Sequence, residues 1–411
     1  MDKRKTALAA FIILCIFTSI GLLNITILCF LILPIVAGFY IYSERQKTNS
    51  IGKTTFTIPD ICFIAVCITE IICYFGSIYK PNSELSTLKI LVVGLLYFFV
   101  KKYITQQEQT HYLYKYIAYI SGVLALSTLL FFFIHKQNYE GMGNLEQYKG
   151  FYRPWGMLSN DWATVLLCFM PFPIISYTIT KSRLKYLFAV FSCLLTICII
   201  VSFSRGAYIS LVAFITVSFV SAFLAGDRKF RRVITKLCVV ISVSSIVVTL
   251  PFSDAITTTF KMNTTVSQKK SVEGRLAKYN EAISVFKSHP ICGVGGGNYT
   301  LAIEQSGNEK QGDDFSPRCT NSYLQLLVEK GIIGSCAYLV LTISILKCSY
   351  RRIREGDKNS AIFLSGVLAI LLREITFSSL FEVDAIFILL IIMCLGICHK
   401  TKSDNYELFK K

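Results

Sequence analysis

Long apolar runs separated by short polar connections dominate the pattern of the chain. The runs are about 20 residues long, which is the length that a helix needs to cross a bilayer. One interval departs from this pattern, because residues 251–323 are mostly polar and far too numerous for a turn. The pattern predicts an all-α polytopic integral membrane protein, with one membrane domain over residues 1–411 and about 12 transmembrane helices.

The predicted spans follow the apolar runs, and the long external loop 251–323 lies between the ninth and the tenth of them. Their expected ranges are 6–22, 25–42, 59–79, 87–104, 113–134, 161–179, 185–203, 207–225, 233–252, 325–346, 360–380 and 384–398. The composition agrees, since 53% of the residues are hydrophobic and 16% are charged. Soluble domains carry about 25% charged residues.

The formal net charge of +17 raises the question of a nucleic-acid partner. The lysines and arginines, however, fall in alternate short connections, for example 101–102, 228–232 and 347–354. Cytoplasmic connections carry this excess of positive charge in membrane proteins. We therefore expect both termini in the cytoplasm, the long loop on the opposite face, membrane lipids as neighbours and no nucleic acid.

The fifteen cysteines are mostly placed one at a time inside the apolar runs, where they act as small hydrophobic residues. Cys292 and Cys319 are the two cysteines of the long loop. They would pair only in an oxidising compartment, and spacing alone does not decide whether they do.

Arg205 stands between two apolar runs, in the turn Ser204-Arg205-Gly206. An arginine at that depth is costly unless it reaches water, a partner or an anion. Gly206 allows close approach of the backbone, and the free amides of a helix beginning at Ala207 point to the same place. This favours an anion site, and an interfacial arginine that reaches to water is the alternative.

Arg275 opens a stretch in which apolar residues recur at helical spacing. We expect an amphipathic helix over 275–288 that lies on the membrane or caps a cavity, with an ordinary surface helix as the alternative. Pro290 and Gly293 would end it.

The glycine cluster 293–297, followed by Asn298, looks like a phosphate-binding loop but lacks the preceding strand and the Lys-Ser/Thr pair. A tight return of the chain is the favoured interpretation. Arg373 and Glu374 form either a structural pair or a functional one, and Glu70 has no obvious partner nearby in the sequence.

In order and spacing, several of these segments resemble the O-antigen ligase and O-antigen polymerase superfamily, which comprises multi-span envelope glycosyltransferases. The resemblance extends over 205–334. It is carried by the arginine turn 204–207, by Gly274-Arg275-Leu276, by His289-Pro290 with the glycine cluster, and by the closing segment 321–334 with Glu329 and Gly331.

The resemblance implies that the donor is a glycan on undecaprenyl diphosphate and that an acceptor sugar hydroxyl displaces the lipid diphosphate. Arg205 and Arg275 are then the catalytic groups that stabilise the departing diphosphate, without a metal, nucleotide or other cofactor. Four further residues are expected to bind substrate: Arg153, Arg318, Thr320 and Asn321.

The acceptor implied by the resemblance is a glycan or lipid A–core, with a chain-length regulator protein as a further partner. The location implied is the bacterial inner membrane, with the active face periplasmic. Ligases of the superfamily carry a histidine at the position of Thr320, and threonine is no base near neutral pH. This favours a polymerase over a ligase and leaves the base unassigned. A transporter or flippase of lipid-linked oligosaccharides, or a non-catalytic assembly subunit, remains open.

Overall fold

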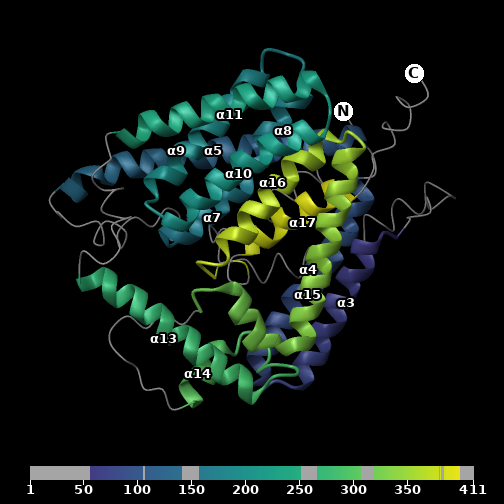
Figure 1. Ribbon diagram of the computed structural model, residues 1–411, viewed down its shortest axis with the longest axis vertical. Helices are drawn as coiled ribbons and strands as arrows, with labels where there is room; N and C mark the ends of the chain where they lie inside the picture. The colour runs from purple at the N-terminus through teal and green to yellow at the C-terminus, as the bar shows by residue number, and fades with distance from the viewer. Residues whose placement is uncertain are drawn as a thin grey trace.

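The computed structural model describes residues 56–104, 107–140, 157–250, 266–306, 319–378, 380 and 384–398. All regular structure within these residues is helical (Figure 1). The helices are α3 (Ile58–Phe75), α4 (Lys80–Ile104), α5 (Gln107–Glu140), α7 (Ser159–Phe169), α8 (Pro171–Ile179), α9 (Lys185–Val201), α10 (Arg205–Leu224), α11 (Arg228–Thr249), α13 (Val266–Ser288), α14 (Tyr299–Gln305), α15 (Ser322–Arg354), α16 (Lys358–Arg373) and α17 (Asp384–Cys398).

Within the described residues, six helical segments are long and apolar enough to cross a membrane, and two shorter apolar helices accompany them. This confirms the all-α polytopic class. The first two predicted spans, 6–22 and 25–42, lie outside the described residues, so the count of about 12 stays a prediction.

Helices α10 and α16 run antiparallel and bring distant connections together. At one end, Lys358 Nζ lies 2.5 Å from Asp227 Oδ2, between the basic segments 228–232 and 347–354. At the other end, Arg373 bonds Ser204, which directly precedes α10. The arrangement places these two basic connections at one end and the arginine turn at the opposite end, as the alternation of charge predicts.

One predicted span, 161–179, is two helices in the structure. Helix α7 ends at Phe169, and α8 begins at Pro171 after a turn at Met170. Proline has no N–H to continue the ladder of hydrogen bonds, and it suits the first position of a new helix. Together α7 and α8 make up one candidate membrane span, Ser159–Ile179, which agrees with the predicted span 161–179.

Helix α15 is also broken, at Gly331, where φ is 60° and ψ is −162°. The break separates a first half, residues 322–330, from a second half that ends at Arg354. Segment 290–295 satisfies the backbone groups that the break frees. Val294 N donates to Val328 O and Gly295 N to Glu329 O, both at 2.9 Å. Ile332 N donates to Pro290 O at 2.9 Å, and Ile333 N donates to Ile291 O at 3.2 Å. Irregular backbone at membrane depth needs such partners.

The glycine cluster makes this docking sterically feasible. Gly293, Gly295 and Gly297 have φ values of 69°, 90° and 76°, which other residues rarely adopt. Asn298 then ties the loop down, since its side-chain Nδ2 donates to Tyr79 O at 3.0 Å and to Val294 O at 3.0 Å. The predicted tight return is confirmed, and its purpose is to cover the break in α15.

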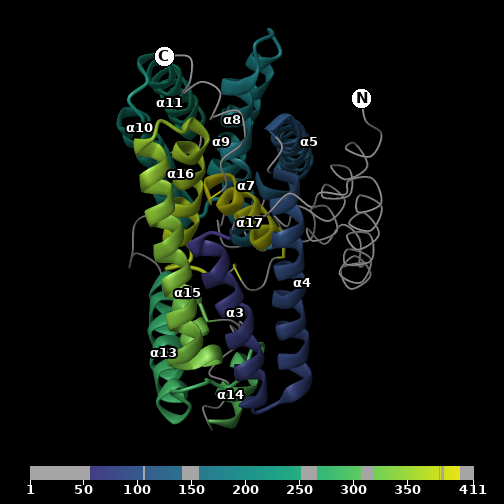
Figure 2. The same cartoon turned by 90° about the vertical axis from the view of Figure 1, so that its right-hand side faces the viewer.

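Helix α13 corrects the prediction of an amphipathic helix over 275–288. It begins at Val266, so Gly274 and Arg275 lie inside the helix and not at its start. One glycine costs about 1 kcal/mol in a helix, too little to end it among residues that favour helix. Ala282 and Val285 face the core, whereas Leu276 is 56% exposed. Figures 1 and 2 show α13 and α14 beside the first half of α15.

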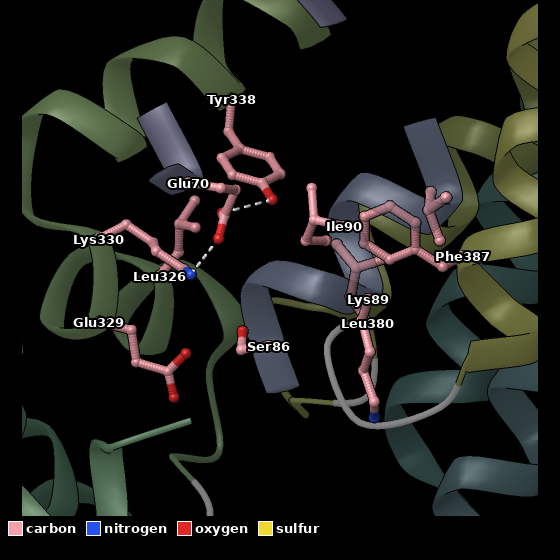
Figure 3. A pocket seen from close by; sticks show the side chains of 11 residues that line it. Glu70, Ser86, Lys89, Ile90, Leu326, Glu329, Lys330, Tyr338, Leu380 and Phe387 are labelled. Atoms are coloured by element: carbon pink, nitrogen blue, oxygen red, sulfur yellow. Dashed lines mark hydrogen bonds and ion pairs between the residues drawn. The ribbon is translucent and has the colours of Figure 1, made fainter. Parts of the chain in front are cut away.

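Glu70, which has no partner nearby in the sequence, is buried in an ion pair with Lys330 (Figure 3). Its second oxygen accepts a hydrogen bond from Tyr338 Oη at 3.1 Å. Glu70 of α3 thus contacts α15 on both sides of the break at Gly331, through Lys330 before it and Tyr338 after it. A buried carboxylate is tolerated when it is paired in this way.

We expect Lys330→Met to lower the free energy of unfolding by about 3–5 kcal/mol, because Glu70 would keep a buried charge without its counterion. Thermal unfolding of the purified protein in detergent measures this. The matched control is Lys358→Met, since Lys358 is 47% exposed and an exposed pair contributes about 1 kcal/mol or less. Adding Glu70→Gln should recover much of the loss, and a single variant as stable as wild type would contradict the prediction.

Candidate functional site

Three arginines from three helices lie toward the end of the bundle opposite the basic connections. Arg205 is the first residue of α10, Arg373 the last of α16, and Arg275 lies inside α13. The charge of Arg275 acts on both Arg205 and Arg373. We call these three residues the arginine cluster: Arg373 bonds Ser204 in the turn that carries Arg205, and Arg275 lies within electrostatic range of both.

Arg373 is the buried member of the arginine cluster, with an exposed fraction of 2%. Its Nη2 donates to Ser204 Oγ at 3.2 Å and to Asn160 O at 3.4 Å, and its Nη1 donates to Thr376 Oγ1 at 3.0 Å. Ser204 Oγ in turn donates to Asn160 Oδ1 at 2.7 Å. Arg373 therefore holds the starts of α7 and α10 together.

Gly206 provides the space for this arrangement. A Cβ atom at Gly206 would lie 2.5 Å from Arg373 Nη1 and would also collide with the hydroxyl of Thr376. The sequence suggested that this glycine gives room to an anion. In the structure, the neighbour that needs the room is the guanidinium of Arg373.

The arginine cluster retains unused capacity to bind an anion. Within the described residues, Arg373 Nε is buried without a hydrogen-bond partner, and the guanidinium lies 4.9 Å from the ring centre of Phe377. Asp161 and Glu374 act on Arg373 with opposite charge, and Arg275 acts on it with like charge. Guanidinium groups and the free amides at the start of a helix both suit phosphate oxygens.

Arg373 and Glu374 are adjacent in the sequence but hydrogen-bond to different elements. Glu374 Oε2 accepts from Ser322 Oγ, and also from Leu380 N at 2.9 Å. The carbonyl of Glu374 accepts from Ser322 N at 3.0 Å. Arg373 thus hydrogen-bonds the turn that carries Arg205, whereas Glu374 hydrogen-bonds the start of α15.

Residues 319–321 stand directly before α15. Asn321 caps this helix, because its Oδ1 accepts from Tyr323 N at 2.9 Å and from Leu324 N at 3.1 Å. Thr320 Oγ1 is buried and has no hydrogen-bond partner among the described residues. Burial raises the pKa of the Cys319 thiol, so this group stays protonated near neutral pH. Cys292 and Cys319 are both free thiols.

Arg153 and Arg318, expected to bind substrate, lie outside the described residues. Arg373 is the site residue to which the sequence assigned no clear role. The only signal for it was an arginine near the outer end of a predicted span, 360–380. Its proximity to Ser204 depends on the antiparallel packing of α10 on α16, which no local pattern reveals.

Residues 187–339 match the profile of a family described as O-antigen ligase. The matched segment contains Arg205, Arg275, the glycine cluster and the broken first part of α15, and it ends before Arg373. No curated protein gives a significant match to the chain. The family match supports the O-antigen ligase and polymerase superfamily, in agreement with the resemblance found in the motifs.

Proposed function

We propose, from membership of residues 187–339 in the O-antigen ligase family, that the chain is a membrane glycosyltransferase acting on a lipid-linked glycan. The donor would be a glycan on undecaprenyl diphosphate, and the acceptor a sugar hydroxyl. The observation that carries the proposal is the arginine cluster, in which Arg373 bonds the turn that bears Arg205 and Arg275 lies within electrostatic range of both.

The reaction makes one bond and breaks one. The acceptor oxygen attacks the anomeric carbon of the donor sugar, and the bond from that carbon to the diphosphate oxygen breaks. The diphosphate leaves with its electron pair and gains negative charge. Arg205 and Arg275 would bind its oxygens through their planar guanidinium groups. Because these cations are in place beforehand, they stabilise the charge that develops in the transition state.

Arg373 acts in this scheme as a positioning residue. It bonds Ser204, which directly precedes Arg205, and so orients the start of α10. The amides of that first turn would point to the same anion. The proton of the acceptor hydroxyl has no assigned receiver, because Thr320 occupies the position of the superfamily's histidine.

The absence of that histidine favours a polymerase, which extends surface polysaccharide chains. A ligase that transfers the glycan to lipid A–core is the second candidate, because the matching family is described as O-antigen ligase.

We place the protein in the bacterial inner membrane with both termini cytoplasmic and the arginine cluster periplasmic, since the basic connections lie at the opposite end. Labelling of Ser267→Cys by an impermeant maleimide only after the inner membrane is opened would refute this orientation.

The surface glycans of a deletion strain test the function. Loss of long chains, with one repeat still attached to lipid A–core, identifies a polymerase. Complete chains that accumulate on the lipid carrier identify a ligase. Single lipid-linked repeats retained on the cytoplasmic face would identify a flippase, and unaltered glycans would overturn the proposal.

A further inference from the structure

Asn160 lies in the first turn of α7, a helix that packs against both α10 and α16 (Figure 1). Its backbone carbonyl accepts a hydrogen bond from Arg373 Nη2 at 3.4 Å and another from Thr164 Oγ1 at 3.0 Å. Its side-chain Oδ1 accepts from Ser204 Oγ at 2.7 Å, and Ser204 directly precedes Arg205. The backbone and the side chain of Asn160 are therefore both fixed beside the turn that carries Arg205.

The hydrogen bonds of Ser204 decide which way the amide of Asn160 faces. A guanidinium group can only donate, so Ser204 Oγ accepts from Arg373 Nη2. The single proton of the Ser204 hydroxyl is then given to Asn160, where it needs a carbonyl oxygen and not an NH₂ group. This chain of bonds holds Oδ1 of Asn160 toward Ser204 and turns Nδ2 away from it.

Asn160 Nδ2 keeps both of its hydrogens for a further partner. Among the residues that the structure describes, the hydrogen bonds of Asn160 involve its carbonyl and Oδ1, and none involves Nδ2. The residue is half-buried, and Nδ2 is not one of its buried atoms. The amide is thus oriented by the protein on one side and open on the other.

The start of α10, next to this amide, lacks its usual cap. A serine at this position normally accepts a hydrogen bond from an amide of the first helical turn. Ser204 makes no such bond, because Arg373 and Asn160 engage its hydroxyl instead. Helix α10 has 20 residues, and the free amides at the start of a helix carry positive partial charge. Asn160 Nδ2 therefore lies beside an uncapped helix start whose first residue is Arg205.

A phosphate oxygen suits this set of groups, because all of them donate. Phosphate oxygens accept several hydrogen bonds at once, from guanidinium groups and from helix amides alike. A neutral donor has a particular advantage here. The charge of Arg275 already acts against Arg205 and Arg373, and a further cation would add to this repulsion. The NH₂ group of Asn160 adds a directed hydrogen bond without adding charge.

We propose that Asn160 binds the donor substrate, with Nδ2 donating to a phosphate oxygen of the lipid diphosphate that Arg205 also contacts. The inference rests on the proposed function and deepens it, because it adds a neutral, oriented donor to the arginines that hold the leaving group. The diphosphate gains negative charge as it departs, so a donor already in place stabilises it further in the transition state.

Two substitutions of similar size separate this role from a structural one. Asn160→Asp keeps an oxygen that accepts from Ser204 and removes the NH₂ group. Asn160→Met removes the NH₂ group without adding a charge. Loss of the Nδ2 donor is common to both variants, whereas loss of the acceptor for Ser204 and gain of a negative charge each affect one of them.

Native mass spectrometry of the full chain in detergent measures binding without requiring turnover. The probe is undecaprenyl diphosphate, and undecaprenol is the reference that has no phosphate. Both variants should weaken binding of undecaprenyl diphosphate about 10-fold or more, since hydrogen bonds to charged groups are the strong ones. Binding of undecaprenol should remain as in wild type.

Asn359 provides the matched control, because it is half-buried at the start of α16, the end of that helix opposite Arg373. Asn359→Asp and Asn359→Met make the same chemical changes there and should bind both lipids as wild type does. Thermal unfolding without ligand checks the fold. Asn160→Asp should unfold as wild type does, since Ser204 keeps its acceptor.

Three results would overturn the role of Asn160. Weaker binding by Asn160→Asp alone would show charge repulsion without a donated bond, and weaker binding by Asn160→Met alone would show that only the bond to Ser204 matters. Wild-type binding by both variants would show that Nδ2 does not contact the diphosphate. Each would leave the proposed transferase function standing, because glycan analysis of the deletion strain tests it separately. Failure of the wild-type chain to bind undecaprenyl diphosphate would contradict both.

Discussion

Replacing Arg205 with lysine should lower the rate of glycan transfer by about 10²–10³-fold, the usual cost of one well-placed electrostatic contact to a transition state. Lysine keeps the positive charge but lacks the planar fork that binds two phosphate oxygens at once. Arg275→Lys should show a similar loss. Both variants should insert and accumulate normally, since Arg205 and Arg275 are only partly buried.

Glycan chain length on gels, read beside immunoblots of the membrane fraction, measures this effect. The matched control is Arg228→Lys, an exposed arginine at the start of α11 and thus at the opposite end of the bundle. It should support chains of normal length. If Arg205 serves only to anchor the interface, lysine will replace it with nearly full function. Normal chains from both Arg205→Lys and Arg275→Lys would rule out the arginine mechanism.

Gly331→Ala should prevent stable folding. A non-glycine residue at φ 60° and ψ −162° costs on the order of 1–3 kcal/mol in backbone strain alone. The added Cβ would also collide with the carbonyl of Ile291 and lie 2.6 Å from Gly293 N. Both atoms belong to the segment that supplies partners for the break in α15, so the strain cannot be relieved without loss of those bonds.

The level of protein in the membrane and its thermal unfolding in detergent report the outcome. Gly274→Ala in α13 is the matched control, because a Cβ there meets nothing within 4 Å and the backbone is helical. That change should stabilise the helix by about 1 kcal/mol or less. A Gly331→Ala protein that accumulates and unfolds as wild type does would show that the break in α15 is dispensable.

The six candidate spans and the two shorter apolar helices of the described residues could be predicted from the sequence because the signal for each is local. An apolar run of sufficient length demands a helix wherever it stands in a bilayer. The grouping of the basic connections 228–232 and 347–354 at one end could also be predicted from the sequence, because positive charge falls in alternate connections. The turn at Arg205 could be recognised because a charge between two apolar runs is conspicuous.

The breaks in the helices could be predicted less well. Pro171 was a readable signal that a new helix starts there, within the single span Ser159–Ile179. The break at Gly331 depends on segment 290–295, which supplies the hydrogen bonds that make it tolerable and which no local pattern reveals. The start of α13 was misplaced because Gly274 was given more weight than its cost of about 1 kcal/mol justifies.

By itself, the sequence determined that this protein is a helical membrane protein, which end of the bundle carries the basic connections, and that Arg205 and Arg275 are its outstanding cations. Only the tertiary structure decided that Arg373 joins them, that Glu70 is neutralised by Lys330, and that Glu329 faces a cavity. The physical reason is that hydropathy and charge act on each segment separately. Ion pairs and cavities, in contrast, arise from side chains that are distant in sequence, such as Glu70 and Lys330, and exist only once the helices have packed.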